Sequence, residues 1–156
     1  MAKAERPYLT ELREWLRPHR GGVFLEWGSG FSTAILADVG REVYTIDHHA
    51  EYQAQVRRAF GELPNVRWIL ADLTGPTRSE EDAGLAYSSA PLGMGVAFDV
   101  AVIDGRDRVA CAATASFLGV RLILLHDFRR ARYRPVESCC TILGTGVHYR
   151  AFRPNA

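Results

Sequence analysis

The chain has 156 residues, of which 47% are hydrophobic and 24% are charged, and this usage is typical of one globular domain. A formal net charge of +1 and the lack of a membrane-length apolar run argue against nucleic acid or a membrane as a partner. Three cysteines without zinc-site or framework spacing exclude a disulfide scaffold, so we expect a cytoplasmic protein.

Residues 1–20 have the periodicity of an amphipathic helix, and strands and helices then alternate as far as residue 127. Apolar runs predict strands at residues 22–28, 41–47, 65–73, 98–104 and 120–127. Helices are predicted at residues 32–40, 50–63 and 107–119. Glycines and prolines interrupt the pattern over 74–97, where we expect a long variable loop with one helical turn that forms a lid or a substrate wall.

Beyond residue 127, a short helix that runs into a strand is expected over 132–142, and a last strand over 146–154. The alternation predicts a Rossmann-like, doubly wound α/β fold. It has a mostly parallel sheet with an antiparallel last strand, and helices on both faces. We expect residues 1–156 to form a single domain, with its ligand beyond the carboxyl ends of the strands.

Every predicted parallel strand ends in a carboxylate or one residue before one. The five residues are Glu26, Asp47, Asp72, Asp104 and Asp127. An acidic residue at a strand end can also cap the next helix, which would explain some of the five but not all of them. The strand ends are therefore the predicted site.

The stretch VFLEWGSGFSTAIL at residues 23–36 joins the first strand to a helix. Gly28 and Gly30 have no side chains, so a ligand can approach the main chain, and the helix points free N–H groups toward it. The third glycine of a dinucleotide loop is replaced by Thr33. The Glu26 carboxylate disfavours a pyrophosphate and favours a cationic ligand.

Asp47 ends the second strand, where an acidic residue binds ribose hydroxyls in nucleoside-binding α/β folds. Asp72 ends the third strand and could accept from an adenine amino group, while His48 would flank the adenine. A nucleoside with a positive, phosphate-free tail fits this set of residues. S-adenosyl-L-methionine, which carries a sulfonium and an ammonium, is such a ligand.

At these residues the sequence resembles the class I S-adenosylmethionine-dependent methyltransferases. The resemblance lies in LEWGSGFST, VYTIDHH, LADL, FDVAVIDGRDR and LILLHDF, between about residues 20 and 130. Further cofactor-binding residues implied by the resemblance are Ser29, Ser32, Thr33 and Leu73. It also implies O-methylation of a small molecule, as in the catechol and macrolide-sugar types.

The resemblance places the chemistry at the fourth and fifth strand ends, where Asp104, His126 and Asp127 are the expected catalytic residues. In metal-dependent relatives the corresponding carboxylates hold a divalent ion, so Asp104 and Asp127 are also candidate ligands of Mg²⁺. His126 could instead be the general base. In some relatives an acidic residue two positions after the first aspartate is the base, but here Arg106 stands there.

The expected partner is a small acceptor, either acidic or a saccharide; a homodimer is also possible. An acidic acceptor is suggested by the arginines expected on the rim of the site, which are Arg106, Arg108, Arg129 and Arg130. Two other functions stay open. One is an NAD(P)-binding oxidoreductase, although the chain has no Tyr-x-x-x-Lys pair. The other is a catalytically silent nucleoside-binding or interaction module.

Overall fold

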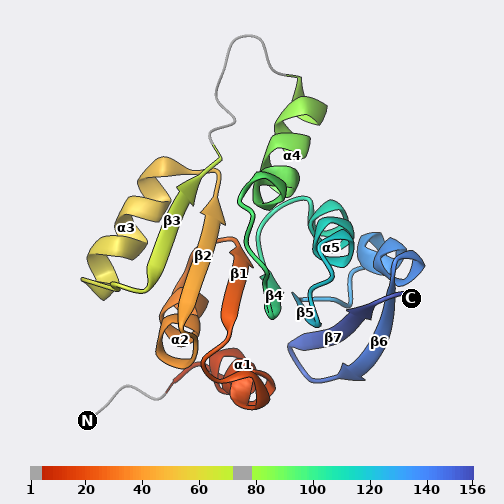
Figure 1. Cartoon of the computed structure of the whole chain (residues 1–156), viewed down its shortest axis with the longest axis horizontal. Helices are drawn as coiled ribbons and strands as arrows, with labels where there is room; N and C mark the ends of the chain where they lie inside the picture. Colours follow the sequence, from red (N-terminus) through yellow and green to blue (C-terminus); the bar gives the residue numbers. More distant parts are fainter. Residues whose placement is uncertain (1–4, 72–78) are drawn as a thin grey trace.

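The computed structural model describes residues 5–71 and 79–156, without the side chains of 80–83. Its centre is a seven-stranded sheet with the strand order β3-β2-β1-β4-β5-β7-β6 (Figure 1). The strands are β1 Val23–Trp27, β2 Glu42–Asp47, β3 Val66–Leu70, β4 Val100–Ile103, β5 Leu122–His126, β6 Cys140–Thr145 and β7 Tyr149–Pro154. β1 to β5 pair in parallel, and β7 is antiparallel to both of its neighbours. The predicted fold class is confirmed.

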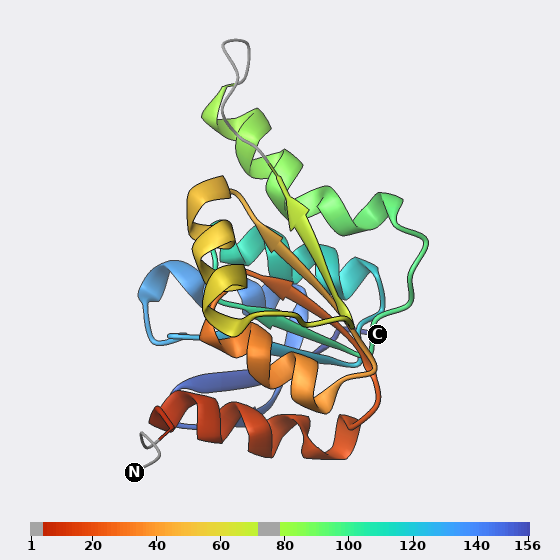
Figure 2. The same cartoon turned by 90° about the vertical axis from the view of Figure 1, so that its left-hand side faces the viewer.

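Helices cover both faces of the sheet, as the two views in Figures 1 and 2 show. The helices are α1 Pro7–Leu16, α2 Phe31–Val39, α3 Ala50–Phe60, α4 Glu80–Ser89 and α5 Arg108–Phe117, with 3-10 turns η1 Arg17–His19, η2 Ala90–Gly93 and η3 Ala131–Ser138. Apolar residues of α1 and α2 form one buried cluster, and those of α4, α5 and η3 form the other. In the described part of the chain, no helix has both the length and the apolar character needed to cross a membrane.

Successive side chains of β1 point to opposite faces of the sheet. Leu25 and Trp27 belong to the cluster beneath α4 and α5, whereas Phe24 belongs to the cluster beneath α1 and α2. Glu26 alternates in the same way as Phe24, so its carboxylate points toward the first turn of α2. Because side chains alternate along the strand, the acidic side chain of Glu26 is buried near the end of β1.

Residues 74–97 are predicted as a long loop with one helical turn, and their described part contains the ten-residue helix α4 and the turn η2. Sequence periodicity does not reveal α4, because Gly84 and the serines interrupt any apolar stripe. Tertiary contacts hold it instead: Tyr87 is fully buried, and Trp27 Nε1 donates to the Tyr87 carbonyl at 3.2 Å. Residues 80–93 of this segment therefore have regular structure that the composition does not predict.

Candidate active site

The turn between β1 and α2 contains two glycines with different roles. Gly28 has φ of +96°, and a Cβ there would lie 2.7 Å from the Gly105 backbone nitrogen. Gly30 is extended, and a Cβ there would meet only the Tyr52 hydroxyl, at 3.5 Å. Gly28 thus lets two strand-end turns touch, whereas Gly30 leaves open space in front of α2. Thr33 Oγ1 accepts from the Gly30 N–H at 2.9 Å and fixes this turn.

The Glu26 carboxylate is fully buried beneath the turn and accepts three hydroxyl hydrogen bonds. Ser32 Oγ donates to Oε1 at 2.5 Å, and Thr33 Oγ1 and Thr45 Oγ1 each donate to Oε2 at 2.6 Å. Burial raises the pKa of Glu26 to about 7, although the three donors favour the ionised form. Since one side chain ties α2 to β2, Glu26 supports the floor of the site and does not line it.

Asp47 ends β2 beside the same turn. Its Oδ2 accepts from the Ser29 N–H at 3.0 Å, and its Oδ1 accepts from the His49 N–H at 2.9 Å. The residue is only 4% exposed, yet it lines the cleft described below. A carboxylate has about four acceptor positions, so Asp47 can hold the glycine turn and still accept from a ligand. His48 lies beside it, with Nδ1 3.6 Å from Asp47 Oδ1.

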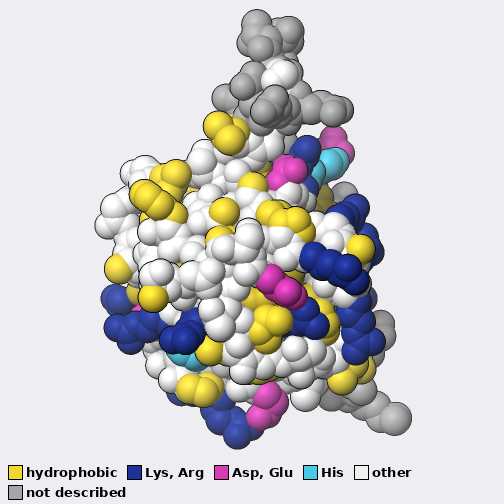
Figure 3. All heavy atoms as spheres, turned by 90° about the vertical axis from the view of Figure 1, so that its right-hand side faces the viewer, with side chains coloured by type: hydrophobic (Ala, Val, Ile, Leu, Met, Phe, Trp, Pro, Cys, Tyr) yellow, Lys and Arg dark blue, Asp and Glu magenta, His cyan; other side chains and the backbone are white. Residues whose placement is uncertain are grey.

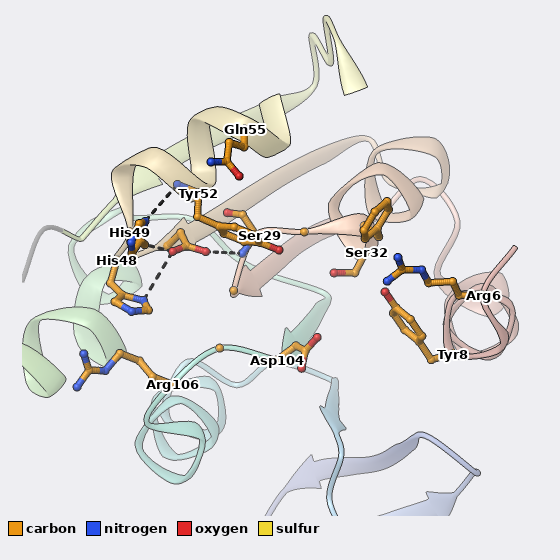
Figure 4. Close-up of a pocket in the computed structure, with 15 residues that line it drawn as sticks. Arg6, Tyr8, Ser29, Ser32, His48, His49, Tyr52, Gln55, Asp104 and Arg106 are labelled. Carbon is orange, nitrogen blue, oxygen red and sulfur yellow. Dashed lines mark hydrogen bonds and ion pairs between the residues drawn. The ribbon is translucent and has the colours of Figure 1, made fainter. Parts of the chain in front are cut away.

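A cleft of about 600 Å³ opens at the carboxyl ends of the strands (Figure 4). One wall consists of residues 28–32, Asp47 and the two histidines that follow it. The opposite wall is the turn after β4, residues 104–106. Arg6 and Tyr8 close one end of the cleft, as Figure 4 shows. The predicted nucleoside site lies at the ends of β1 and β2. Across the cleft it faces a different wall, which the turn after β4 forms.

Asp104 is the charged centre of the second wall. Its Oδ1 lies 2.8 Å from His126 Nδ1 and 3.2 Å from Arg108 Nη2. Because a carboxylate only accepts, the shared proton belongs to His126 Nδ1. Asp104 lines the cleft and its side chain is 28% exposed, whereas His126 is 21% exposed and lies behind it. The arrangement leaves the second oxygen of Asp104 for a ligand.

Arg108 fixes the geometry of this pair. Its guanidinium donates to the carbonyls of His126 at 2.6 Å and Asp104 at 3.0 Å, and its Nε donates to the Gly105 carbonyl at 2.8 Å. One side chain thus holds the ends of β4 and β5 together. The sequence placed Arg108 on the rim among other arginines and gave no sign of this structural role.

Tyr8 is a cleft residue that the sequence analysis did not identify. The centre of its ring lies 5.2 Å from the centre of the His126 ring. The ring of Tyr149, the first residue of β7, lies 4.9 Å from the same His126 ring. Tyr8 is spaced with Leu9 and Leu12 as part of an apolar helical face, a pattern that predicts core packing. Only the docking of α1 against the sheet reveals its position over the site.

Asp127 does not join the other two predicted catalytic residues. It lies one residue past β5 with φ of +54°, and its Oδ2 pairs with Arg130 Nη2 at 2.7 Å. Among the described residues, no group of three or more His, Cys, Asp or Glu side chains is placed to hold a metal ion. Within these residues the candidate Mg²⁺ ligands Asp104 and Asp127 do not form part of such a group, and no step is assigned to a metal. Asp72 and Leu73, the predicted adenine-side residues, lie outside the described part of the chain.

Comparison with known proteins identifies the fold. No family model and no curated protein sequence matches the chain. Among solved structures, a methyltransferase-like protein from Silicibacter pomeroyi is 25% identical, with a TM-score of 0.73 over 98% of this chain and 88% of that one.

Two further structures are more distant. The N-methyltransferase NodS from Bradyrhizobium japonicum, in complex with S-adenosyl-L-homocysteine, is 14% identical, with a TM-score of 0.63 over 97% of this chain and 90% of that one. A Staphylococcus aureus protein described as a caffeoyl-CoA O-methyltransferase is 15% identical, with a TM-score of 0.63 over 97% and 85%. The chain has the fold of the class I S-adenosylmethionine-dependent methyltransferases, as the sequence resemblance implied.

Proposed function

We propose that the protein is an S-adenosylmethionine-dependent methyltransferase that methylates a hydroxyl group of a small molecule or sugar. The observation that carries the proposal is the cleft, in which Asp47 and the Gly30 turn face Asp104. In this proposal the adenosine part of the cofactor lies over the turn at residues 28–30, with ribose hydroxyls donating to Asp47. Ser29, Ser32, Thr33 and Glu26 shape that turn through the contacts above.

When bound, the cofactor supplies a methyl group on a sulfonium, which is already activated for displacement. The chain must align the acceptor oxygen with that methyl and remove the acceptor proton. Asp104 takes this proton on its second oxygen while the new C–O bond forms and the C–S bond breaks. His126 and Arg108 are positioning residues, since they hold Oδ1 and leave the other oxygen toward the cleft.

Calorimetric titration with S-adenosylhomocysteine, S-adenosylmethionine and NAD tests the binding half of the proposal. We expect the first two to bind and NAD not to bind, because Glu26 beneath the turn disfavours a pyrophosphate. Preferred binding of NAD would instead support an oxidoreductase. Transfer of labelled methyl from the cofactor to hydroxylated acceptors tests the catalytic half, and binding without any transfer would indicate the silent module.

A further inference from the structure

A second cavity, of about 830 Å³, lies between the first half of α5 and the turn η3. Gly105 and Arg106 line both this cavity and the cleft, so the two adjoin at the turn after β4. Val109, Ala110 and Ala113 of α5 give the second cavity an apolar wall. A molecule that occupies it would extend away from the nucleoside side of the cleft.

The polar side chains that line this cavity are three arginines, Tyr133 and one carboxylate, Asp107, which pairs with Arg106 at 2.9 Å. Two guanidiniums lie near the Tyr133 ring, with Arg108 Cζ 5.2 Å and Arg132 Cζ 5.0 Å from its centre. Arg132 Nη2 also donates to the Tyr133 hydroxyl oxygen at 2.9 Å. That oxygen accepts from Arg132, and its own proton meets no acceptor among the described residues, so the hydroxyl can donate to a ligand.

Arg132 is exposed and forms no ion pair with a carboxylate in the part of the chain that the structure describes. By contrast, Arg106 and Arg108 pair with Asp107 and Asp104. Figure 3 shows arginine and hydrophobic side chains next to one another on the face that lies on the right in Figure 1. A guanidinium that has no carboxylate partner among the described residues and lies beside an apolar wall complements an anionic group on an apolar body.

Arg108 contacts both the proposed base, Asp104, and a residue that lines this cavity, Tyr133. Its Nη2 lies 3.2 Å from Asp104 Oδ1, and its Cζ lies 5.2 Å from the centre of the Tyr133 ring. The Arg108 guanidinium, which lines the cavity, is therefore in direct contact with Asp104. The cavity and the cleft share Gly105 and Arg106 as lining residues, so a ligand in the cavity can extend past this turn toward the cleft.

We propose that this cavity binds the methyl acceptor and that the acceptor is a hydroxy acid with an apolar, ring-sized body. Its carboxylate accepts from Arg132 and from the Tyr133 hydroxyl, its body lies on the apolar wall of α5, and its hydroxyl faces Asp104. The assignment rests on the proposed function for the identity of the ligand as an acceptor, but the preference for an acid follows from the cavity alone.

Ligand-observed NMR tests this preference with hydroxybenzoates and hydroxyphenylacetates, each paired with its primary amide, in the presence of S-adenosylhomocysteine. The wild-type protein should bind the acids roughly tenfold more tightly than the amides, the difference typical of one charge-assisted hydrogen bond. Arg132→Gln should remove the preference. Tyr133→Phe, which keeps the ring, should reduce it by a smaller factor.

Arg134→Gln is the matched control, because Arg134 is also an exposed arginine of η3 but lines a different cavity. It should keep the full preference. The proposal is overturned if no acid binds, if acids and amides bind equally, if the preference survives in Arg132→Gln, or if Arg134→Gln removes it. Titration of S-adenosylhomocysteine on the same samples separates the two hypotheses: its failure to bind contradicts the proposed function, while the comparison of acid with amide still tests the cavity.

Discussion

The two walls of the cleft use their carboxylates in opposite ways. On the β1–β2 side, Glu26 is fully buried beneath the wall and the side chain of Asp47 is 6% exposed, and the chain itself supplies three hydroxyl and two backbone N–H donors to them. On the β4–β5 wall, Asp104 and His126 remain 28% and 21% exposed and form a pair with each other. The first wall is a preorganised support, whereas the second keeps polar atoms accessible for chemistry.

The largest expected effect concerns the contact between the walls. Gly28→Val places a β-branched side chain at φ of +96° and against the Gly105 backbone. We expect a loss of about 4 kcal/mol in the free energy of unfolding, the sum of backbone strain and overpacking. Urea denaturation measures it.

Gly30→Val is the matched control, because a Cβ at Gly30 meets only Tyr52 Oη. Its free energy of unfolding should lie within about 1 kcal/mol of the wild-type value, because no backbone clash arises. Its affinity for S-adenosylhomocysteine should fall. A Gly28→Val protein as stable as the wild type would show that the two turns do not need their close contact.

The second prediction uses the buried acid of the first wall. The pKa of Glu26 is raised from 4.5 to about 7 by burial, so between these pH values the folded state keeps a proton that the unfolded chain has lost. The folded state then binds more protons, and stability falls as pH rises through this window. The loss should reach about 3 kcal/mol for a shift of this size. Glu26→Gln should flatten this part of the stability profile in denaturation experiments, and an unchanged slope would contradict a raised pKa.

The third prediction tests the accessible wall. Asp104→Asn keeps the shape and the acceptor for His126 but removes the base, so turnover should fall by about 10²-fold or more. S-adenosylhomocysteine affinity should change by less than about threefold, since Asp104 lies across the cleft from the proposed nucleoside wall.

Asp127→Asn gives the comparison within the same wall. Because Asp127 pairs with Arg130 and does not line the cleft, its loss should leave turnover close to that of the wild type. Equal loss of turnover in both variants would mean that Asp127 moves into the site on binding. Parallel loss of affinity and rate in Asp104→Asn would place Asp104 in cofactor binding.

The two walls also differ in how far the sequence predicts them. Buried apolar runs that end in an acid locate strands and strand ends, and Glu26, Asp47 and Asp104 all lie where such a run meets the edge of the sheet. An apolar run in the sequence does not show which of the acidic side chains at its end reaches the cleft. Glu26 points beneath α2 because of strand alternation, and Asp127, next to His126 in sequence, is left outside by its left-handed backbone.

Contacts between distant segments are the part that the sequence could not give. Tyr8 belongs to a helix that begins more than a hundred residues before His126, and its periodicity is that of a packing residue. α4 lacks an apolar stripe, and burial of Tyr87 against the core places it. Both depend on tertiary docking, which overrides local propensity.

The smallest expected effect returns to the first wall and separates its support role from its binding role. Asp47→Ala should weaken S-adenosylhomocysteine binding by about 1.5–3 kcal/mol, the range for hydrogen bonds to a charged group. Asp47→Asn is the matched control for support: its amide oxygen can still accept from one of the Ser29 and His49 N–H groups. Calorimetry with S-adenosylhomocysteine and its 2′-deoxy analogue distinguishes the roles. If Asp47 binds ribose, Asp47→Ala should cost the ribose ligand more than the deoxy ligand, because only the former donates a second hydroxyl. Equal losses for both ligands would mean that Asp47 acts only by holding the glycine turn.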